Sequence, residues 1–150
     1  MSINITCQLE KISLEELTAY MRFQADESFP SLKAENKIQT FASKLHDNAD
    51  FCVSRDNGEM VGMIAYYANG QGADFAYISH VYVSPEYRKM NLFTTMFERV
   101  KLDVRHKGFT EIRLEVSKDN TIAQSAYSSC GFLPVEIECS NSIFMSMTLK

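Results

Sequence analysis

Two adjacent cations, Arg88 and Lys89, stand just before a stretch that has the periodicity of a helix. The mostly apolar residues 75–83 precede them and favour a strand. A turn between a strand and a helix can bind an anion, because the first N–H groups of the helix lack an internal partner and the helix dipole adds about half a positive charge. Arg88 could add a bidentate contact to a phosphate. The stretch is compatible with a phosphate-binding turn, but taken alone it favours a solvated basic turn before a core helix.

Other common sites are not indicated by the residue spacing. Gly-Lys-Ser/Thr of a P-loop is absent here, as are the three glycines of a dinucleotide fingerprint. The three histidines, His46, His80 and His106, do not have the spacing of metal ligands, so we expect no metal site. No two cysteines form a Cys-x-x-Cys motif, and buried free thiols are expected instead.

The elements that would hold the basic turn follow from hydrophobic periodicity and from turn residues. Ser13 and Glu16 have the spacing of a capping box and predict a helix start, and Asp56-Asn57-Gly58 predicts a hairpin. The helix after the basic turn is expected to end near Gly108, and a shorter one at Gly131. The predicted strands are 3–9, 51–55, 59–67, 75–83, 111–116, 132–138 and 143–149, and the predicted helices start near 13, 31, 92 and 121.

This order of elements predicts an α/β (α+β) fold in one domain, residues 1–150. The helix between strands 75–83 and 111–116 implies a parallel crossover, while hairpins at both ends imply antiparallel pairs. We therefore expect a mixed, mostly antiparallel sheet. The methionine-rich last strand could pack in the core or in a homodimer interface.

Composition and charge narrow the class of protein. The chain has 150 residues, 45% hydrophobic and 23% charged, which suits a globular domain with a substantial core. Its net charge of −4 gives no general attraction to nucleic acid or to an anionic membrane. The charged residues among the first twenty argue against a signal peptide, and no apolar run reaches the ~20 residues of a membrane span. We expect a soluble protein of a reducing, cytoplasmic compartment.

Two segments and the order of elements resemble the GNAT family of acetyl-CoA-dependent N-acetyltransferases. "VYVSPEYRKMNLF" is similar to that family's strand followed by Arg/Gln-x-x-Gly-x-Gly/Ala, and "LEVSKDNTIAQSAYSSCGF" is similar to its second, more specific signature. Asn91 and Phe93 stand where the first motif usually has small residues. Asn tolerates a left-handed backbone better than most residues. The resemblance implies a GNAT-like sheet with helices on both faces and a β-α-β core that binds acetyl-CoA.

The resemblance also implies which residues contact acetyl-CoA, the expected co-substrate. The strand amides would pair with the pantetheine arm, and the turn would hold the pyrophosphate. Asn120 would lie beside the arm, although an N-cap explains it as well. The implied residues are Val81, Tyr82, Val83, Arg88, Lys89, Met90, Asn91, Leu92, Phe93, Thr94 and Asn120.

Amine acetylation needs a base for the amine and an acid for the departing thiolate. Tyr127 matches the family's general acid. Alternatively, Tyr127 is only a core aromatic, because it shares a helix face with Ile122, Ala123, Ala126 and Cys130. Glu115 matches a base used by members that acetylate peptide N-termini, and a solvated carboxylate is equally compatible.

The predicted strand 75–83 contains a second candidate for the base. Tyr77 and Ser79 occupy a place where other members carry an acid. His80 is the runner-up base, but strand alternation directs it away from Tyr77 unless a bulge intervenes.

The sequence therefore predicts an N-acetyltransferase that moves an acetyl group from acetyl-CoA to a primary amine of a small molecule or peptide by direct attack in a ternary complex. A catalytically silent acyl-CoA-binding or regulatory module of the same fold is the alternative, favoured by Asn91, Phe93 and the missing acid at Tyr77. An unrelated α/β domain with a structural basic turn is a third interpretation. The acceptor segments, 20–50 and 134–145, carry no recognisable code.

Overall fold

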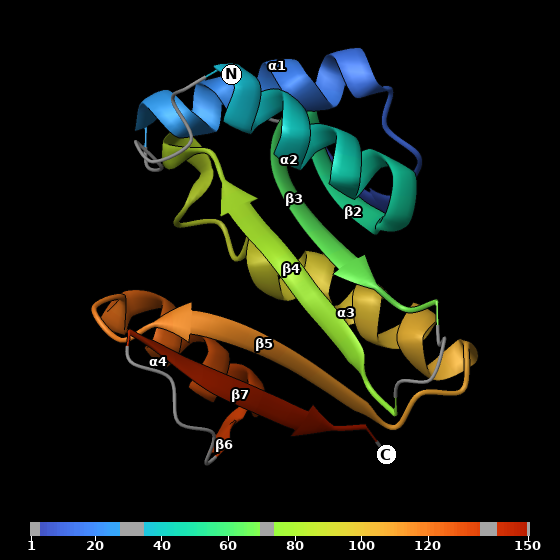
Figure 1. Ribbon diagram of the computed structural model, residues 1–150, viewed down its shortest axis with the longest axis vertical. Coiled ribbons are helices and arrows are strands. Elements are labelled where there is room, and N and C mark those ends of the chain that lie inside the picture. The colour runs from blue at the N-terminus through green and yellow to red at the C-terminus, as the bar shows by residue number, and fades with distance from the viewer. Residues whose placement is uncertain (1–3, 28–34, 70–73, 136–140, 150) are drawn as a thin grey trace.

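The computed structural model describes residues 4–27, 35–69, 74–135 and 141–149 (Figure 1). Within them the strands form one seven-stranded sheet in the order β1-β2-β3-β4-β5-β7-β6. The strands are β1 (Ile5–Leu9), β2 (Asp50–Asp56), β3 (Glu59–Tyr67), β4 (Ala76–Val83), β5 (Glu111–Ser117), β6 (Leu133–Val135) and β7 (Ser142–Thr148), and the helices are α1 (Leu14–Glu27), α2 (Glu35–Asn48), the short 3-10 turn η2 (Pro85–Tyr87), α3 (Leu92–His106) and α4 (Thr121–Cys130).

The pairing of the strands confirms the predicted mixed sheet. β4 and β5 are parallel, and they are joined through α3, whereas the other neighbouring pairs are antiparallel. The predicted hairpin turn is present between β2 and β3, and its Asn57 and Gly58 both have positive φ, 52° and 90°. The predicted start of α2 at residue 31, the start of the first predicted strand at residue 3 and residues 136–138 of the sixth lie outside the described residues.

Helices cover both faces of the sheet, and each face has its own core. α3 and α4 pack on one face, where their apolar residues meet Ile112, Leu114 and Met145. α1 and α2 pack on the other face of β2, β3 and β4 around Leu17, Met21 and other apolar residues. We name these the α3 face and the α1 face. Met147 also lies on the α3 face, so the methionines of the last strand pack in the core.

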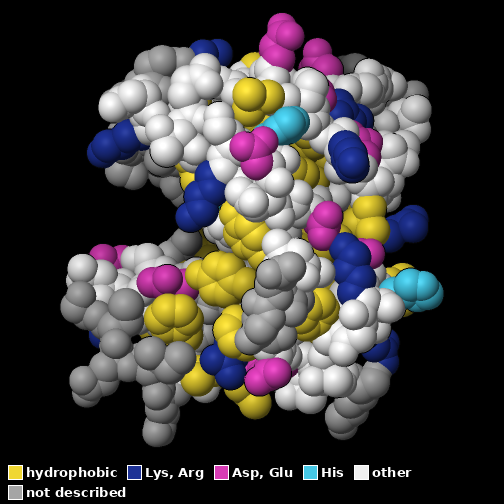
Figure 2. All heavy atoms as spheres, turned by 45° about the vertical axis from the view of Figure 1, so that its right-hand side comes forward, with side chains coloured by type: hydrophobic (Ala, Val, Ile, Leu, Met, Phe, Trp, Pro, Cys, Tyr) yellow, Lys and Arg dark blue, Asp and Glu magenta, His cyan; other side chains and the backbone are white. Residues whose placement is uncertain are grey.

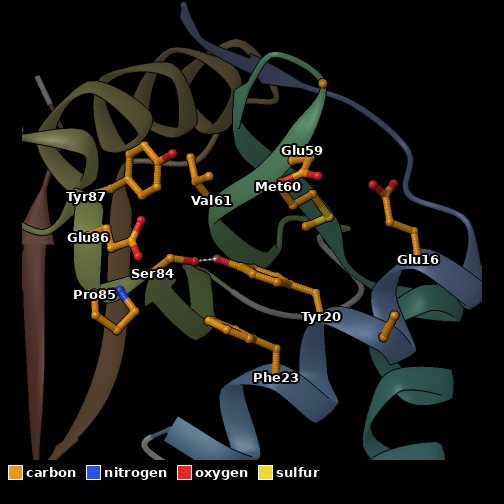
Figure 3. A pocket seen from close by; sticks show the side chains of 12 residues that line it. Glu16, Tyr20, Phe23, Glu59, Met60, Val61, Ser84, Pro85, Glu86 and Tyr87 are labelled. Carbon is orange, nitrogen blue, oxygen red and sulfur yellow. Dashed lines mark hydrogen bonds between the residues drawn. The ribbon is translucent and has the colours of Figure 1, made fainter. Parts of the chain in front are cut away.

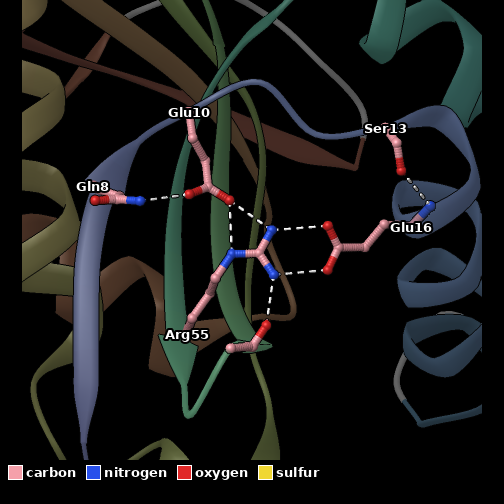
Figure 4. A network of polar contacts seen from close by, with 6 residues as sticks. Gln8, Glu10, Ser13, Glu16 and Arg55 are labelled. Carbon is pink, nitrogen blue, oxygen red and sulfur yellow. Dashed lines mark hydrogen bonds and ion pairs between the residues drawn. The ribbon is translucent and has the colours of Figure 1, made fainter.

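An ion-pair network fixes the start of α1 to the sheet (Figure 4). The Ser13 hydroxyl accepts a hydrogen bond from the Glu16 N–H at 3.1 Å, which confirms the predicted N-cap. The Glu16 carboxylate does not complete the predicted capping box. It pairs with both terminal nitrogens of Arg55, at 2.7 and 2.8 Å. Glu10 also binds the guanidinium, at 2.6 Å. The network therefore ties β1, α1 and β2 together.

One irregularity in β4 changes which face its residues occupy. Ala65 pairs with His80, but the next residue, Tyr66, pairs with Ile78, so Ser79 is an extra residue in β4. Ala76 and Ile78 lie on the α3 face, while Tyr82 lies on the α1 face. An unbroken strand would put all three on one face. The bulge at Ser79 therefore turns the rest of β4 over, and the alternation expected for His80 is wrong.

Candidate active site

A wedge opens between β4 and β5. The two strands pair only where Ala76–Ile78 lie beside Ile112–Leu114. Beyond Ile78 they diverge, as Figure 1 shows. Figure 2 shows the surface hollowed at one side between the part that carries α1 and α2 and the part that carries β5, β7 and α4. The predicted pantetheine-binding residues, 81–83, lie in the separated half of β4, so this edge of the strand has no strand partner among the described residues.

The chain turns sharply where the wedge meets α3. η2 follows β4, and Asn91 then adopts the left-handed conformation, with φ 56° and ψ 30°, as the N-cap of α3. This position is where a glycine is usual in the resembling motif, and Asn meets the same backbone requirement at modest cost. The departure at Asn91 is therefore compatible with the turn.

The turn presents a group of unsatisfied backbone donors. The N–H of Arg88 bonds to the Pro85 carbonyl and that of Met90 to the Tyr87 carbonyl, each at 3.4 Å. The N–H groups of Lys89 and of residues 91–94 have no backbone acceptor within the described part of the chain. They lie at the N-terminus of α3, where the helix dipole favours an anion. Five of the seven predicted pyrophosphate-binding residues thus keep their amides available for a phosphate.

The Arg88 side chain makes contacts within the protein at both ends of its guanidinium. Its Nε donates to the Val83 carbonyl at 2.8 Å, and its Nη2 forms an ion pair with Glu27 at the end of α1. The guanidinium carbon lies 5.4 Å from the centre of the Tyr82 ring, and the Tyr82 hydroxyl donates to Glu27 at 2.7 Å. Arg88 therefore links the turn to α1.

Tyr127 lies beside the start of α3. Its ring packs edge-on against Phe93, with centroids 5.4 Å apart, and against Phe132 at 6.0 Å. Burial, with a smaller effect of Cys130, raises its pKa to about 12. Its hydroxyl makes no hydrogen bond to another described residue. Phe93, the large residue at the small-residue position, thus supports the phenol from α3.

The packed face of α4 is narrower than its sequence predicted. Ala123, Tyr127 and Cys130 contact the α3-face core, but Ile122 is 85% exposed and Ala126 is also exposed. Asn120 caps the helix by accepting the Ala123 N–H at 3.1 Å, which confirms the N-cap interpretation. Its side-chain amide nitrogen can still donate to a ligand.

Glu115 lies on the opposite face of the sheet from Tyr127. Leu114 and Val116 are buried on the α3 face, so Glu115 between them points to the α1 face, as predicted, and it is exposed. The Ser142 hydroxyl of β7 donates to its carboxylate. Glu115 also contributes to the raised pKa of Tyr77, after burial, which shows that the two side chains are near each other.

The bulge brings a second group to the α1 face. His80 Nε2 lies 2.5 Å from Gln24 Oε1 of α1, and its ring meets Phe41 of α2 edge-on with centroids 5.5 Å apart. Burial lowers the pKa of His80 to about 4, so its imidazole is neutral at pH 7. Nearby, the buried Tyr67 hydroxyl has no hydrogen-bond partner among the described residues. From the sequence His80 was only the runner-up base, because alternation without a bulge directs it away from Tyr77.

A separate pocket of about 590 Å³ lies on the far side of the turn (Figure 3). The Tyr20 and Phe23 rings of α1 stack along one wall, and Glu86 and Tyr87 stand opposite. The Tyr20 hydroxyl is 2.8 Å from that of Ser84. The pocket shares no lining residue with the predicted cofactor or catalytic groups. It therefore borders the candidate site without forming part of it.

Within the described residues, no group of three or more His, Cys, Asp or Glu side chains could hold a metal ion. None of the helices described is both long and apolar enough to cross a bilayer.

Known proteins resemble this chain in sequence and in fold. Over 104 residues it is 24% identical to the probable N-acetyltransferase camello of Xenopus tropicalis, a match that covers 69% of this chain and 48% of that protein. The chain thus spans about half the length of this relative.

Two solved structures share the fold along nearly the whole chain. The PaiA N-acetyltransferase of Thermoplasma acidophilum, solved in complex with coenzyme A, is 19% identical with a TM-score of 0.72, covering 99% of each chain. The ribosomal-protein-S18-alanine N-acetyltransferase of Escherichia coli is 20% identical with a TM-score of 0.75, covering 97% of this chain and 95% of its own.

The family model described as the acetyltransferase (GNAT) family matches residues 13–132. That range includes α1, the basic turn, the wedge and α4, so the match covers the candidate site as well as the fold. The chain therefore belongs to the acetyltransferase (GNAT) family.

Proposed function

We propose that this protein transfers an acetyl group from acetyl-CoA to a primary amine of a small molecule or peptide, by direct attack in a ternary complex. One observation carries the proposal: the β4–β5 wedge ends at five unpaired amides, with a phenol on one face of the sheet and a carboxylate on the other. The relatives support it, since one was solved with coenzyme A and another is named for acetylating an alanine.

Acetyl-CoA would lie along the separated half of β4. β4 has no strand partner on its β5 side at residues 81–83 within the described part of the chain, although the Val83 carbonyl accepts a hydrogen bond from Arg88, and the pantetheine arm can add there like a further strand. The pyrophosphate would sit on the amides of Lys89 and of residues 91–94. Asn120 can contribute through its amide nitrogen while its oxygen caps α4. The thioester would then lie in the wedge between β4 and β5, which groups on both faces of the sheet can approach.

The amine would approach from the α1 face. Most primary amines are protonated at pH 7, so the amine must lose a proton before it can attack. Glu115 is exposed on this face and can take that proton through a water molecule. The Ser142 hydroxyl holds the carboxylate in place. A backbone amide near Val81 can stabilise the oxyanion that follows the attack.

The thiolate leaves toward the α3 face. Tyr127 lies on that face, and its phenol is protonated at pH 7, as an ordinary phenol is; burial raises its pKa further, to about 12. The phenol can protonate the sulfur as the carbon–sulfur bond breaks. Phe93 and Phe132 fix the ring on two sides, which limits the directions that the hydroxyl can take.

The alternative, a silent acyl-CoA-binding module, rests on the unusual residues of the turn and on the tyrosine at position 77. The structure weakens the argument from Asn91 for a silent module, because this residue adopts the left-handed conformation that the turn needs. Binding alone would satisfy this alternative, whereas transfer would exclude it.

The test combines two measurements on the purified chain. Calorimetric titration should show saturable binding of acetyl-CoA and weaker binding of pantetheine without its phosphates. A panel of amines and peptides with free N-termini should then release thiol in the presence of acetyl-CoA, against a blank without acceptor because Cys7 and Cys130 are partly accessible. Absence of binding at millimolar cofactor would refute the proposed function, and binding without transfer would favour the silent module.

A further inference from the structure

The pocket beside the turn, named here the Tyr20 pocket, has the size of a small-molecule site. Its volume of about 590 Å³ lies within the usual range for ligand pockets in proteins (Figure 3). It is formed where α1, the hairpin between β2 and β3, and η2 meet. Acetyl transfer as proposed above uses none of its lining residues, so the pocket has no role in that reaction.

One wall of the Tyr20 pocket is aromatic. The rings of Tyr20 and Phe23 are parallel to within 5°, and their centroids lie 6.0 Å apart. Phe23 is 49% exposed, so a ligand in the pocket can reach its ring. The faces of aromatic rings attract organic cations, because the ring quadrupole places negative charge there.

The charged groups that line the pocket are all of one sign. Glu16, Glu59 and Glu86 line it, and there is no Lys, Arg or His among the described lining residues. Arg55 pairs with Glu16, at 2.7 Å. The carboxylates of Glu59 and Glu86 are exposed and make no hydrogen bond or ion pair with a described residue. The lining therefore favours a cation, and it would repel the phosphates of a cofactor.

The two unpaired carboxylates act on the same part of the pocket. The hydrogen bond to Asp56 is the main cause that raises the pKa of Tyr87 to about 12, and Glu86 and Glu59 add smaller effects. Both carboxylates are therefore close enough to affect one phenol. Figure 3 shows the Glu86 carboxylate directed from η2 into the pocket.

A pair of buried hydroxyl groups adds a hydrogen-bond donor to the lining. The hydroxyls of Tyr20 and Ser84 share one hydrogen bond of 2.8 Å, and each residue is only 8% exposed. Two hydroxyls carry two hydrogens, and this bond uses one of them. The other has no acceptor among the described residues. A ligand oxygen in the pocket can satisfy it.

We propose that the Tyr20 pocket binds a small organic ammonium ion that also carries a hydroxyl or carbonyl oxygen. Its apolar part lies against Phe23, its nitrogen is attracted by Glu59 and Glu86, and its oxygen accepts the remaining hydroxyl hydrogen. A metal ion would find no ligand in the aromatic wall, whereas an ammonium ion is attracted by the rings and the carboxylates alike.

The Tyr20 pocket also lies against the turn that would hold the pyrophosphate. η2 forms part of its lining, and the Pro85 and Tyr87 carbonyls accept the N–H groups of Arg88 and Met90 in the turn. A bound cation offsets the negative charge of Glu86 beside this turn, which favours the phosphates of the cofactor. Each ligand should therefore raise the affinity for the other by the same factor. This coupling rests on the proposed function, whereas the ammonium site does not.

The first test uses choline as the probe and compares it with its uncharged analogue, in which a tert-butyl group replaces the trimethylammonium group. A quaternary nitrogen cannot accept an acetyl group, so binding is measured apart from transfer. Calorimetric titration of the whole chain without cofactor should show saturable choline binding, about tenfold tighter than binding of the analogue. Added salt should weaken it. Absence of choline binding, or equal affinity for both probes, would overturn the ammonium site.

Three substitutions and a matched control locate the binding. Glu59→Gln and Glu86→Gln should each weaken choline binding by about fivefold, and Phe23→Leu should do the same because it removes the ring face. Glu98→Gln removes the same charge at an exposed position on α3, outside the pocket, and should bind choline like the parent. Parental affinity in the double variant of Glu59 and Glu86 would overturn the assignment to this pocket.

The coupling is tested with coenzyme A, which carries no acetyl group to transfer. Saturating choline should tighten coenzyme A binding by about fivefold, and Glu86→Gln should tighten it without choline. An unchanged coenzyme A affinity would overturn the coupling and leave the ammonium site. A chain that binds choline but no cofactor would refute the proposed function, and with it the coupling, while the ammonium site would stand.

Discussion

Replacing Tyr127 by Phe separates a catalytic phenol from a core aromatic. The substitution keeps the ring contacts with Phe93 and Phe132 and removes only the hydroxyl. That hydroxyl makes no hydrogen bond to another described residue. Its loss should therefore cost less than the about 1 kcal/mol that a hydrogen bond contributes to stability. For a chain of this size the melting temperature should fall by no more than about 3 °C.

The expected effect on turnover is much larger. If the phenol protonates the departing thiolate, kcat should fall by roughly 10²-fold or more, which is about 2.7 kcal/mol in the activation barrier. The pKa of Tyr127 is about 12, so the phenol stays protonated and the loss should be similar across pH 6–9. Acetyl-CoA affinity should hold, because the hydroxyl acts on the leaving group after binding.

Tyr66→Phe provides the opposite pattern as a control. The Tyr66 hydroxyl donates to Asp103 at 2.7 Å, away from the wedge. Its removal should lower stability by about 1 kcal/mol and leave kcat unchanged. The assay is thiol release under saturating acetyl-CoA, with melting followed by circular dichroism. A Tyr127→Phe variant that turns over at the parental rate would show that the acid assignment is wrong.

The remaining predictions concern the amine side, the turn and alkaline stability. Glu115→Gln should lower kcat/KM by about 10²-fold with little change in acetyl-CoA affinity, and equal activity across pH 6–9 would exclude this carboxylate as base. Asn91→Gly should tighten acetyl-CoA binding in calorimetry, since the left-handed backbone stays and no Cβ remains near the phosphates; weaker binding would contradict that geometry. Burial raises the pKa of both Tyr20 and Tyr127 from 10 to about 12. Their contribution to the free energy of unfolding is therefore complete below about pH 10 and should be lost as the pH rises toward 12. Urea denaturation at pH 9, 10.5 and 12 would test this, and a constant midpoint would contradict it.

Much of the fold was predictable from the sequence because its signals are local. The period of apolar residues, the Asn-Gly turn and the caps at Ser13 and Gly131 act within one or two turns of chain, and they marked the elements and the mixed sheet. The resemblance placed Asn91 at a position where glycine is usual, and Asn tolerates the left-handed backbone that it adopts there. The resemblance then indicated which strand and turn would meet acetyl-CoA.

Side-chain destinations were less predictable, since they depend on partners distant in the sequence. The ion pair of Arg88 with Glu27, sixty-one residues away, was not expected from the sequence, which indicated only a possible phosphate contact for this side chain. Ile122 was expected on the packed face of α4, yet it is 85% exposed and the packed stripe runs through Ala123, Tyr127 and Cys130. Helical periodicity indicates a stripe, but the width of that stripe is decided by what it packs against.

The face that His80 occupies was decided by tertiary structure alone. In the sequence, residues 75–83 read as one uninterrupted strand, and strict alternation directs His80 away from Tyr77. Pairing of β4 with β3 inserts one extra residue at Ser79, and a shift of one residue turns every following side chain to the other face. The register of two strands is set by the fit of both faces to their helices, a condition that no single stretch of sequence contains.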